Sequence, residues 1–211
     1  RNVLLALHER GLRPLVTLWH FTLPDWFAES GGWEQSDAPK LFTRYCVHVV
    51  QELGDLCDNY ATMNEPMIVT GMGYLSSVWP PFYKFAFIRS LRVLTHMAKG
   101  HRMTYDYVKE KNQKKDVGIV KHTHVYSAEK NVFNRVRAWF ANIVRMYSFM
   151  FFIYKKCDWI GLNYYRRTIY GDTRELLKTD IGWSRDPEGI YEALHLLKRY
   201  KKPIFISEAG C

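Results

Sequence analysis

The chain of 211 residues is long enough for one domain with a hydrophobic core, and its 47% hydrophobic and 24% charged residues are typical of an ordinary globular protein. It contains no apolar run of about 18 residues, so we expect no membrane-spanning helix. The formal charge of +9 would suit binding to nucleic acid or another polyanion. However, the basic residues gather in short clusters at 109–115 and 198–202, at predicted helix ends, where positive charge is favourable in itself. We therefore expect neither nucleic acid nor a membrane as a partner.

Helix-like and strand-like stretches alternate along the chain. Residues 40–54, for example, carry apolar side chains at helical spacing, whereas residues 203–207 (PIFIS) are a short apolar run. The predicted helices are residues 3–10, 40–54, 88–110, 132–154 and 187–200. The predicted strands are residues 14–20, 57–63, 117–126, 159–165 and 203–207. Strands that alternate with helices predict a parallel sheet of the α/β class.

Several predicted strands end in polar or aromatic side chains. In a (β/α)8 barrel the carboxyl ends of the strands build the active site. The first predicted strand is not followed by a GxGxxG motif, which argues against a dinucleotide-binding sheet. Five strands cannot close a barrel, which usually takes about 250 residues. We therefore predict a (β/α)8 TIM barrel that is incomplete in this chain.

Two glutamates at predicted strand ends carry a candidate chemistry. Glu65 lies in the sequence TMNEP and Glu208 in ISEAG, with further strands and crossover helices between them. In a barrel, strand ends that far apart face each other across the mouth. Two carboxyl groups about 5–5.5 Å apart are what a retaining glycosidase uses, because one protonates the leaving oxygen while the other attacks the anomeric carbon.

The same two motifs resemble the TxNEP and ITENG motifs of glycoside hydrolase family 1, the β-glucosidase and β-galactosidase family. Other segments are similar to this family in the same order: TLWHFTLPDWF and GGW to its third strand, WIGLNYY to its sixth strand, and PEGIYEALHLLKRYKKPIFISEAG to the helix and strand before its nucleophile. The resemblance implies that residues 1–211 form a partial catalytic domain, with strands three to seven of the eight. It implies a retaining hydrolase of small β-linked glycosides that needs no cofactor.

The resemblance assigns the acid/base role to Glu65 and the nucleophile role to Glu208. Glu65 would then be protonated and Glu208 ionised at neutral pH, so we expect a bell-shaped pH–rate profile with its optimum on the acidic side of neutrality. Each residue also has a structural interpretation. Glu65 before a proline can cap a loop, and Glu208 can form an ion pair with a lysine.

Four further residues match substrate-binding positions of the family. Asn64 matches the residue that hydrogen-bonds the sugar 2-hydroxyl, and His20 matches one that contacts the 3-hydroxyl. Tyr165 matches the tyrosine that orients the nucleophile, and Asn163 a neighbouring polar support. The structural alternatives are a buried core histidine at position 20 and barrel packing at positions 163 and 165.

Other chemically suggestive residues have plainer interpretations. His122 and His124 alternate along a predicted strand and share a face, but a metal site needs further ligands, so we expect no metal. Trp33 and Trp79 can either stack on sugars or pack in the interior.

The four cysteines are scattered without CxxC spacing, which argues against a zinc site or a disulfide framework. We interpret Cys46, Cys57, Cys157 and Cys211 as reduced and mostly buried thiols, which favours a cytoplasmic protein.

The chain departs from the family pattern at two positions near the expected site. Phe21 stands where family members often have Trp, and Ala209 replaces the usual Asn after the nucleophile. The residues of strands one, two and eight are not in this sequence. Two alternatives to the leading hypothesis therefore stay open: a 6-phospho-β-glycosidase, and a non-catalytic sugar-binding or structural relic of the barrel.

Overall fold

The computed structural model describes residues 1–129, 131–172 and 177–210, and its centre is a five-stranded sheet in the order β1-β2-β3-β5-β7. All neighbouring strands in this sheet are parallel. The strands are β1 (Leu15–Thr17), β2 (Asn59–Asn64), β3 (Asp116–His122), β4 (Val125–Ala128), β5 (Ile160–Tyr164), β6 (Arg167–Tyr170) and β7 (Ile204–Ala209). The predicted α/β class and five parallel strands are confirmed, in the form of an open half-barrel.

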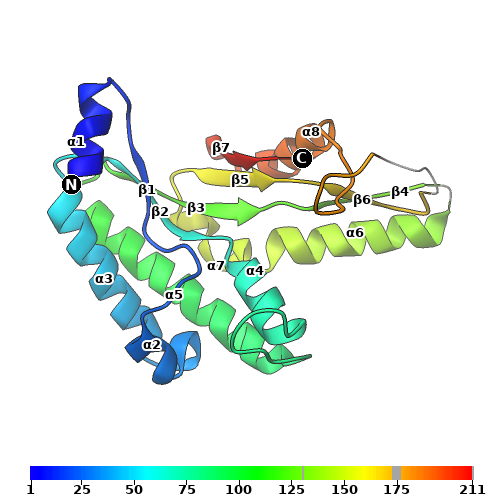
Figure 1. Ribbon diagram of the computed structural model, residues 1–211, viewed down its shortest axis with the longest axis horizontal. Coiled ribbons are helices and arrows are strands. Elements are labelled where there is room, and N and C mark those ends of the chain that lie inside the picture. The colour runs from blue at the N-terminus through cyan, green and yellow to red at the C-terminus, as the bar shows by residue number, and fades with distance from the viewer. Residues whose placement is uncertain (130, 173–176, 211) are drawn as a thin grey trace.

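The helices surround the curved sheet (Figure 1). They are α1 (Asn2–Glu9), α2 (Asp25–Glu29), α3 (Ala38–Leu53), α4 (Pro66–Thr70), α5 (Phe87–Lys111), α6 (Val132–Tyr147), α7 (Met150–Ile153) and α8 (Gly189–Leu197), with 3-10 turns at Gly32–Glu34, Tyr154–Lys156 and Lys198–Tyr200 and a π-helical turn at Gly71–Leu75. In Figure 1, α8 lies on the opposite side of the strands from α6 and α7.

The long helices α3 and α5 pack against each other through small and apolar side chains. Phe42, Cys46 and Val50 recur every four residues and form the buried face of α3. A β-carbon at Gly100 of α5 would lie 3.0 Å from the Phe42 ring, so the absence of a side chain there lets the two helices approach closely.

The central strands are buried on both faces, as parallel strands between layers must be. Every residue of β5 is buried, and so is β2 from Tyr60 to Asn64. Inside the half-barrel the ring of Trp159 covers Gly118, where a β-carbon would come within 2.3 Å of the ring. The edge strands β1 and β7 are instead largely exposed.

Two predicted elements are divided in the structure. The predicted strand 117–126 is two strands: β3 pairs with β2 and β5 as far as His122, and β4 begins at Val125 and pairs with β6 in a separate two-stranded sheet. Sequence analysis missed β6. The predicted helix 132–154 ends at Tyr147, and the chain continues as the short helix α7 and a 3-10 turn.

No helix in the described part of the chain is long and apolar enough to cross a membrane. Cys46, Cys57 and Cys157 are buried free thiols, whereas Cys211 lies outside the described residues.

Candidate active site

Irregular pairing of β2 and β3 shapes one half of the site. Ala61 pairs with Gly118, but the next pair is Asn64 with Val120, so β2 has one residue more than its partner strand. Such a bulge bends the strand and re-aims the side chains that follow it. The residues that it re-aims here are Asn64 and Glu65, at the carboxyl end of the strand.

The backbone holds Glu65 in an unusual conformation. Its φ of 44° and ψ of 58° lie in the left-handed region, which residues other than glycine rarely adopt. Its N–H donates to the Val120 carbonyl (2.9 Å), and its own carbonyl accepts from the Ile68 N–H (2.9 Å) in the first turn of α4. Backbone strain of this kind gathers at functional sites, where the surrounding structure holds it in place.

A chain of side-chain hydrogen bonds crosses the sheet at its carboxyl end. The Asn163 amide donates to Glu65 Oε1 (2.7 Å) and to Asn64 Oδ1 (3.1 Å). The Asn64 amide in turn donates to His20 Nε2 (3.0 Å), and Ser207 Oγ donates to Asn163 Oδ1 (2.8 Å). Asn163 is fully buried and Asn64 is 2% exposed, so these bonds satisfy polar groups that water cannot reach.

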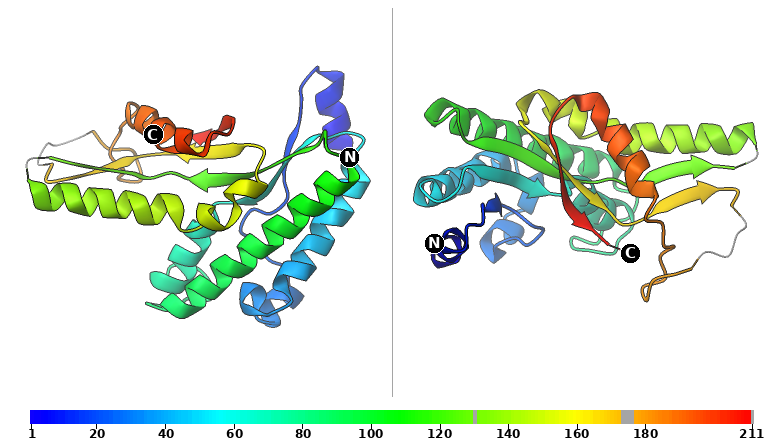
Figure 2. Two further views of the ribbon diagram at one scale, coloured as in Figure 1. Left: turned by 180° about the vertical axis from the view of Figure 1, so that it is seen from behind. Right: turned by 90° about the horizontal axis from the view of Figure 1, so that it is seen from above.

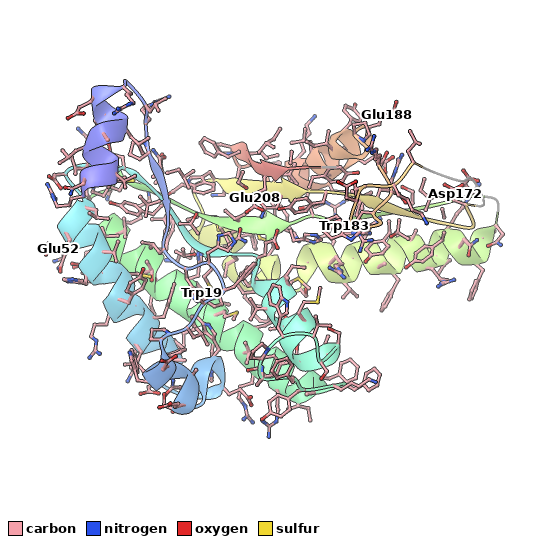
Figure 3. The ribbon with its side chains drawn as sticks, in the orientation of Figure 1. Trp19, Glu52, Asp172, Trp183, Glu188 and Glu208 are labelled. Atoms are coloured by element: carbon pink, nitrogen blue, oxygen red, sulfur yellow. The ribbon has the colours of Figure 1, made fainter. Side chains whose placement is uncertain are left out.

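The other half of the site lies on β7. Glu208 pairs with Asn163 of β5 after an irregularity that leaves Ser207 as an extra residue, which is why Ser207 reaches Asn163 from beside Glu208. Tyr165 Oη donates a short hydrogen bond to Glu208 Oε2. The ring of Trp183 lies 5.7 Å from the Tyr165 ring, and Figure 3 shows Glu208 and Trp183 toward the same end of the sheet.

The two carboxyl groups have different electrostatic surroundings. Burial raises the pKa of Glu65 to about 7; the Asn163 hydrogen bond and the charge of Lys121 oppose this shift, whereas the charge of Glu208 adds to it. Burial and the hydrogen bond to Glu208 also raise the pKa of Tyr165, so its hydroxyl stays a donor. Glu65 therefore keeps a proton through most of the range below neutrality, as a general acid must.

The structure places all six predicted site residues along this end of the sheet, and a hydrogen bond joins each of them to at least one other. They are His20, Asn64, Glu65, Asn163, Tyr165 and Glu208. The charge of Glu208 contributes to the raised pKa of Glu65.

Sequence analysis missed two residues of this site. Ser207 supports Asn163, and its position beside Glu208 in ISEAG was a visible signal. Lys121 is 8% exposed, and its Nζ donates to the Arg145 carbonyl (2.8 Å). Its sequence signal was a lysine that directly follows the apolar run VGIV at 117–120.

The remaining candidates have structural roles. Trp33 is 3% exposed, and its ring lies 5.3 Å from Trp19 and 5.2 Å from Phe42, so it packs in the core. Trp79 packs against Phe21 at 5.0 Å, and both line a cavity of about 630 Å³ beside the site. Trp33 lines the same cavity but is 3% exposed, so sugar stacking fits Trp79 better than Trp33.

His122 and His124 do share a face, with ring centroids 6.1 Å apart. His124 Nε2 bonds Thr168 Oγ1 (2.8 Å), and burial lowers the pKa of His124 to about 4. Within the described ranges, no group of three or more His, Cys, Asp or Glu side chains is arranged to hold a metal ion.

Several known proteins resemble this chain in sequence and in fold. The beta-galactosidase of Sulfolobus acidocaldarius is 30% identical over 262 residues, which cover 100% of this chain and 52% of that protein. The galactolipid galactosyltransferase SFR2 of Arabidopsis thaliana is 29% identical over 227 residues, which cover 99% of this chain and 36% of that protein. The solved beta-glycosidase from Pyrococcus horikoshii superposes with a TM-score of 0.87 at 31% identity, covering 99% of this chain and 55% of that one.

The chain thus spans about half the length of most of these relatives, and about a third of SFR2. The model of glycosyl hydrolase family 1 matches residues 1–152. This match covers more than half of the chain and includes the TMNEP segment, and the structural likeness extends through β7. The chain belongs to glycosyl hydrolase family 1.

Proposed function

We propose that the protein containing this chain is a retaining β-glycosidase, with Glu65 as the acid/base and Glu208 as the nucleophile. The observation that carries the proposal is the difference between the two glutamates. Burial raises the pKa of Glu65 to about 7, whereas Glu208 lies on a largely exposed strand and accepts a hydrogen bond from Tyr165. When two carboxyl groups lie in such different surroundings, one can act as the acid and the other as the nucleophile.

The proposed reaction has two steps. A carboxylate oxygen of Glu208 attacks the anomeric carbon while Glu65 gives its proton to the departing glycosidic oxygen, which leaves as an alcohol. Glu65, now ionised, takes a proton from water, and the resulting hydroxide attacks the same carbon and releases Glu208. This sequence requires the two carboxyl groups to lie about 5–5.5 Å apart in the intact protein.

The other hydrogen-bonding residues have positioning and binding roles in this proposal. Asn163 holds Glu65 Oε1, and the exposed His20, which the buried Asn64 holds by a hydrogen bond, presents a polar group to sugar hydroxyls. We propose small β-linked glycosides as substrates, in line with the beta-galactosidase and beta-glucosidase names of the relatives. The identity of the sugar then depends on residues outside this sequence.

The test is covalent trapping. The full-length protein is incubated with an activated 2-fluoro-β-glucoside, and its intact mass and peptides are then measured. We expect the addition of one fluoroglycosyl group on the peptide that contains Glu208 and none in the Glu208→Gln variant.

A second candidate, a non-catalytic barrel relic, is favoured by two observations: Ala209 follows Glu208, and β7 is a largely exposed edge strand. Absence of both labelling and aryl-glycoside hydrolysis in the full-length protein would support the relic. Hydrolysis that inverts the configuration at the anomeric carbon, seen by proton NMR, would contradict the retaining mechanism.

A further inference from the structure

Helix α6 turns its large apolar side chains toward solvent. Phe133, Val136, Phe140 and Val144 are 71%, 55%, 61% and 43% exposed. Their spacing of three or four residues places them in one row along the helix. Trp139 (64% exposed) lies beside this row, and Phe151 of α7 (71%) continues it. We call these six residues the α6 stripe.

The face of α6 that meets the rest of the molecule is small and polar. Ala138 is buried there, and the Asn142 amide donates to the Tyr126 carbonyl (2.7 Å) while its oxygen accepts from the Tyr126 N–H (3.0 Å). Asn131 accepts from the Asn134 N–H (2.7 Å) at the start of the helix. These bonds fix the rotation of α6 against β4, so the usual arrangement of a surface helix, apolar inside and polar outside, is reversed.

Positive charge borders the α6 stripe. Residues 132–156 contain five basic residues, Arg135, Arg137, Arg145, Lys155 and Lys156, and no acidic residue. At 100° per residue, Arg135 and Arg137 lie on opposite flanks of the apolar row, and both are exposed. An exposed aromatic and aliphatic row flanked by arginines is the pattern of a helix that lies in the interface of an anionic bilayer.

Further strands of a barrel are poor candidates to cover the stripe. The crossover that contains α6 joins β4 to β5, and β3 and β5 already have neighbours on both sides. New strands of the five-stranded sheet would pair at β1 or β7, and their helices would pack over those edges rather than outside α6. Figures 1 and 2 show α6 extending beyond the five-stranded sheet, beneath β4 and β6.

A second copy of the chain is also disfavoured. A symmetric contact places the same patch on both partners, so arginines that flank one stripe would face those that flank the other. Like charges brought together at an interface oppose association.

We propose that the α6 stripe docks on the surface of a bilayer that contains anionic lipids. The apolar row would enter the boundary between headgroups and acyl chains, while Arg135 and Arg137 pair with lipid phosphates. This proposal departs from our expectation from sequence, because the sequence pattern does not tell which face of α6 points outward. It describes a helix lying on the membrane rather than crossing it.

The test is vesicle flotation with the full-length protein. We expect binding to vesicles of phosphatidylcholine mixed with phosphatidylglycerol, little binding to phosphatidylcholine alone, and release as salt is added. The triple variant Phe133→Ser/Trp139→Ser/Phe140→Ser should bind at least about tenfold more weakly. The double variant Arg135→Gln/Arg137→Gln should lose the preference for anionic vesicles.

A matched control carries serine at Phe85 and Phe87, which are 67% and 66% exposed but lie outside the α6 stripe. It should bind vesicles like the wild type, and circular dichroism checks that each variant is folded. Binding that is absent, indifferent to anionic lipid, or lost equally in the control would overturn the proposal. So would a concentration-dependent dimer, measured by light scattering, that the triple variant abolishes while no vesicles bind.

Discussion

Glu65 and Glu208 lie at the same end of one sheet but in opposite kinds of surroundings. Glu65 follows β2, a strand with a neighbour on each side, and is 7% exposed. Glu208 lies on β7, which among the described strands pairs only with β5 and is largely exposed. The core therefore fixes the position and raises the pKa of Glu65, whereas Glu208 is held by a hydrogen bond from the Tyr165 hydroxyl at the edge of the sheet.

The largest effect expected from this contrast is the loss of activity in Glu208→Gln. Removing the proposed nucleophile should lower kcat/KM of the full-length protein for an aryl β-glucoside by on the order of 10³-fold or more. The same change should alter the free energy of unfolding by less than about 1 kcal/mol, because the residue is on an exposed edge strand. Steady-state kinetics and thermal unfolding measure the two quantities. A large loss of stability would mean that β7 is part of the core.

Glu65→Gln should lower activity by about 10²- to 10⁴-fold and also change stability with pH. The folded state raises the pKa of Glu65 from 4.5 to about 7, so the folded protein binds the proton more tightly than the unfolded chain does. Stability is therefore lost as pH rises above the unfolded value, by up to about 3 kcal/mol once the group is ionised.

The glutamine variant has no such proton to lose. Relative to wild type, it should gain stability between about pH 5 and about pH 8, as chemical denaturation at each pH would measure. A difference between the two proteins that does not change with pH would contradict a raised pKa at Glu65.

A packing test of the same contrast compares the centre of the sheet with its edge. In Gly118→Ala the new methyl group would overlap the ring of Trp159, since a β-carbon there lies within 2.3 Å of it. Overpacking of this kind costs about 1–3 kcal/mol. Ile206→Ala, on the edge strand at 54% exposure, should cost less than about 1 kcal/mol. Equal losses of unfolding free energy in the two variants, measured by urea denaturation, would show that β7 is covered in the intact protein.

The sequence predicted the elements better than their finer geometry. Helices predicted at 40–54 and 88–110 are observed at Ala38–Leu53 and Phe87–Lys111, because apolar periodicity depends on local spacing. The strand predicted at 117–126 has no break in its pattern; it divides because its partner changes from β5 to β6, which is a tertiary event.

The site was predictable to a similar extent. The ends of parallel strands meet at one edge, so motifs at those ends could be placed together. The extra residues in β2 and β7 leave no signal in a single sequence, yet they aim Glu65 toward Asn163 and bring Ser207 into the network. The exposure of the apolar row on α6 could not be predicted either. The sequence pattern shows that the row exists, but it does not tell whether the row faces the core or the solvent.

The smallest expected effect concerns Lys121, a buried lysine whose charge lowers the pKa of Glu65. Burial lowers the pKa of Lys121 itself to about 7, so both groups titrate in the same range. In Lys121→Met the pKa of Glu65 should rise, because an attractive positive charge is lost. The basic limb of the pH profile of kcat/KM should therefore move to higher pH.

Lys115 provides the control, because it is equally buried at the opposite end of β3, where its Nζ donates to the Cys57 carbonyl (2.9 Å). Lys115→Met should reduce stability, since it leaves buried carbonyls without a donor, but it should not move the basic limb. If both variants shift the limb alike, the effect of Lys121 is a general loss of packing. If only Lys121→Met shifts the limb, the charge of Lys121 on the helix side of β3 lowers the pKa of the Glu65 carboxyl at the mouth of the half-barrel.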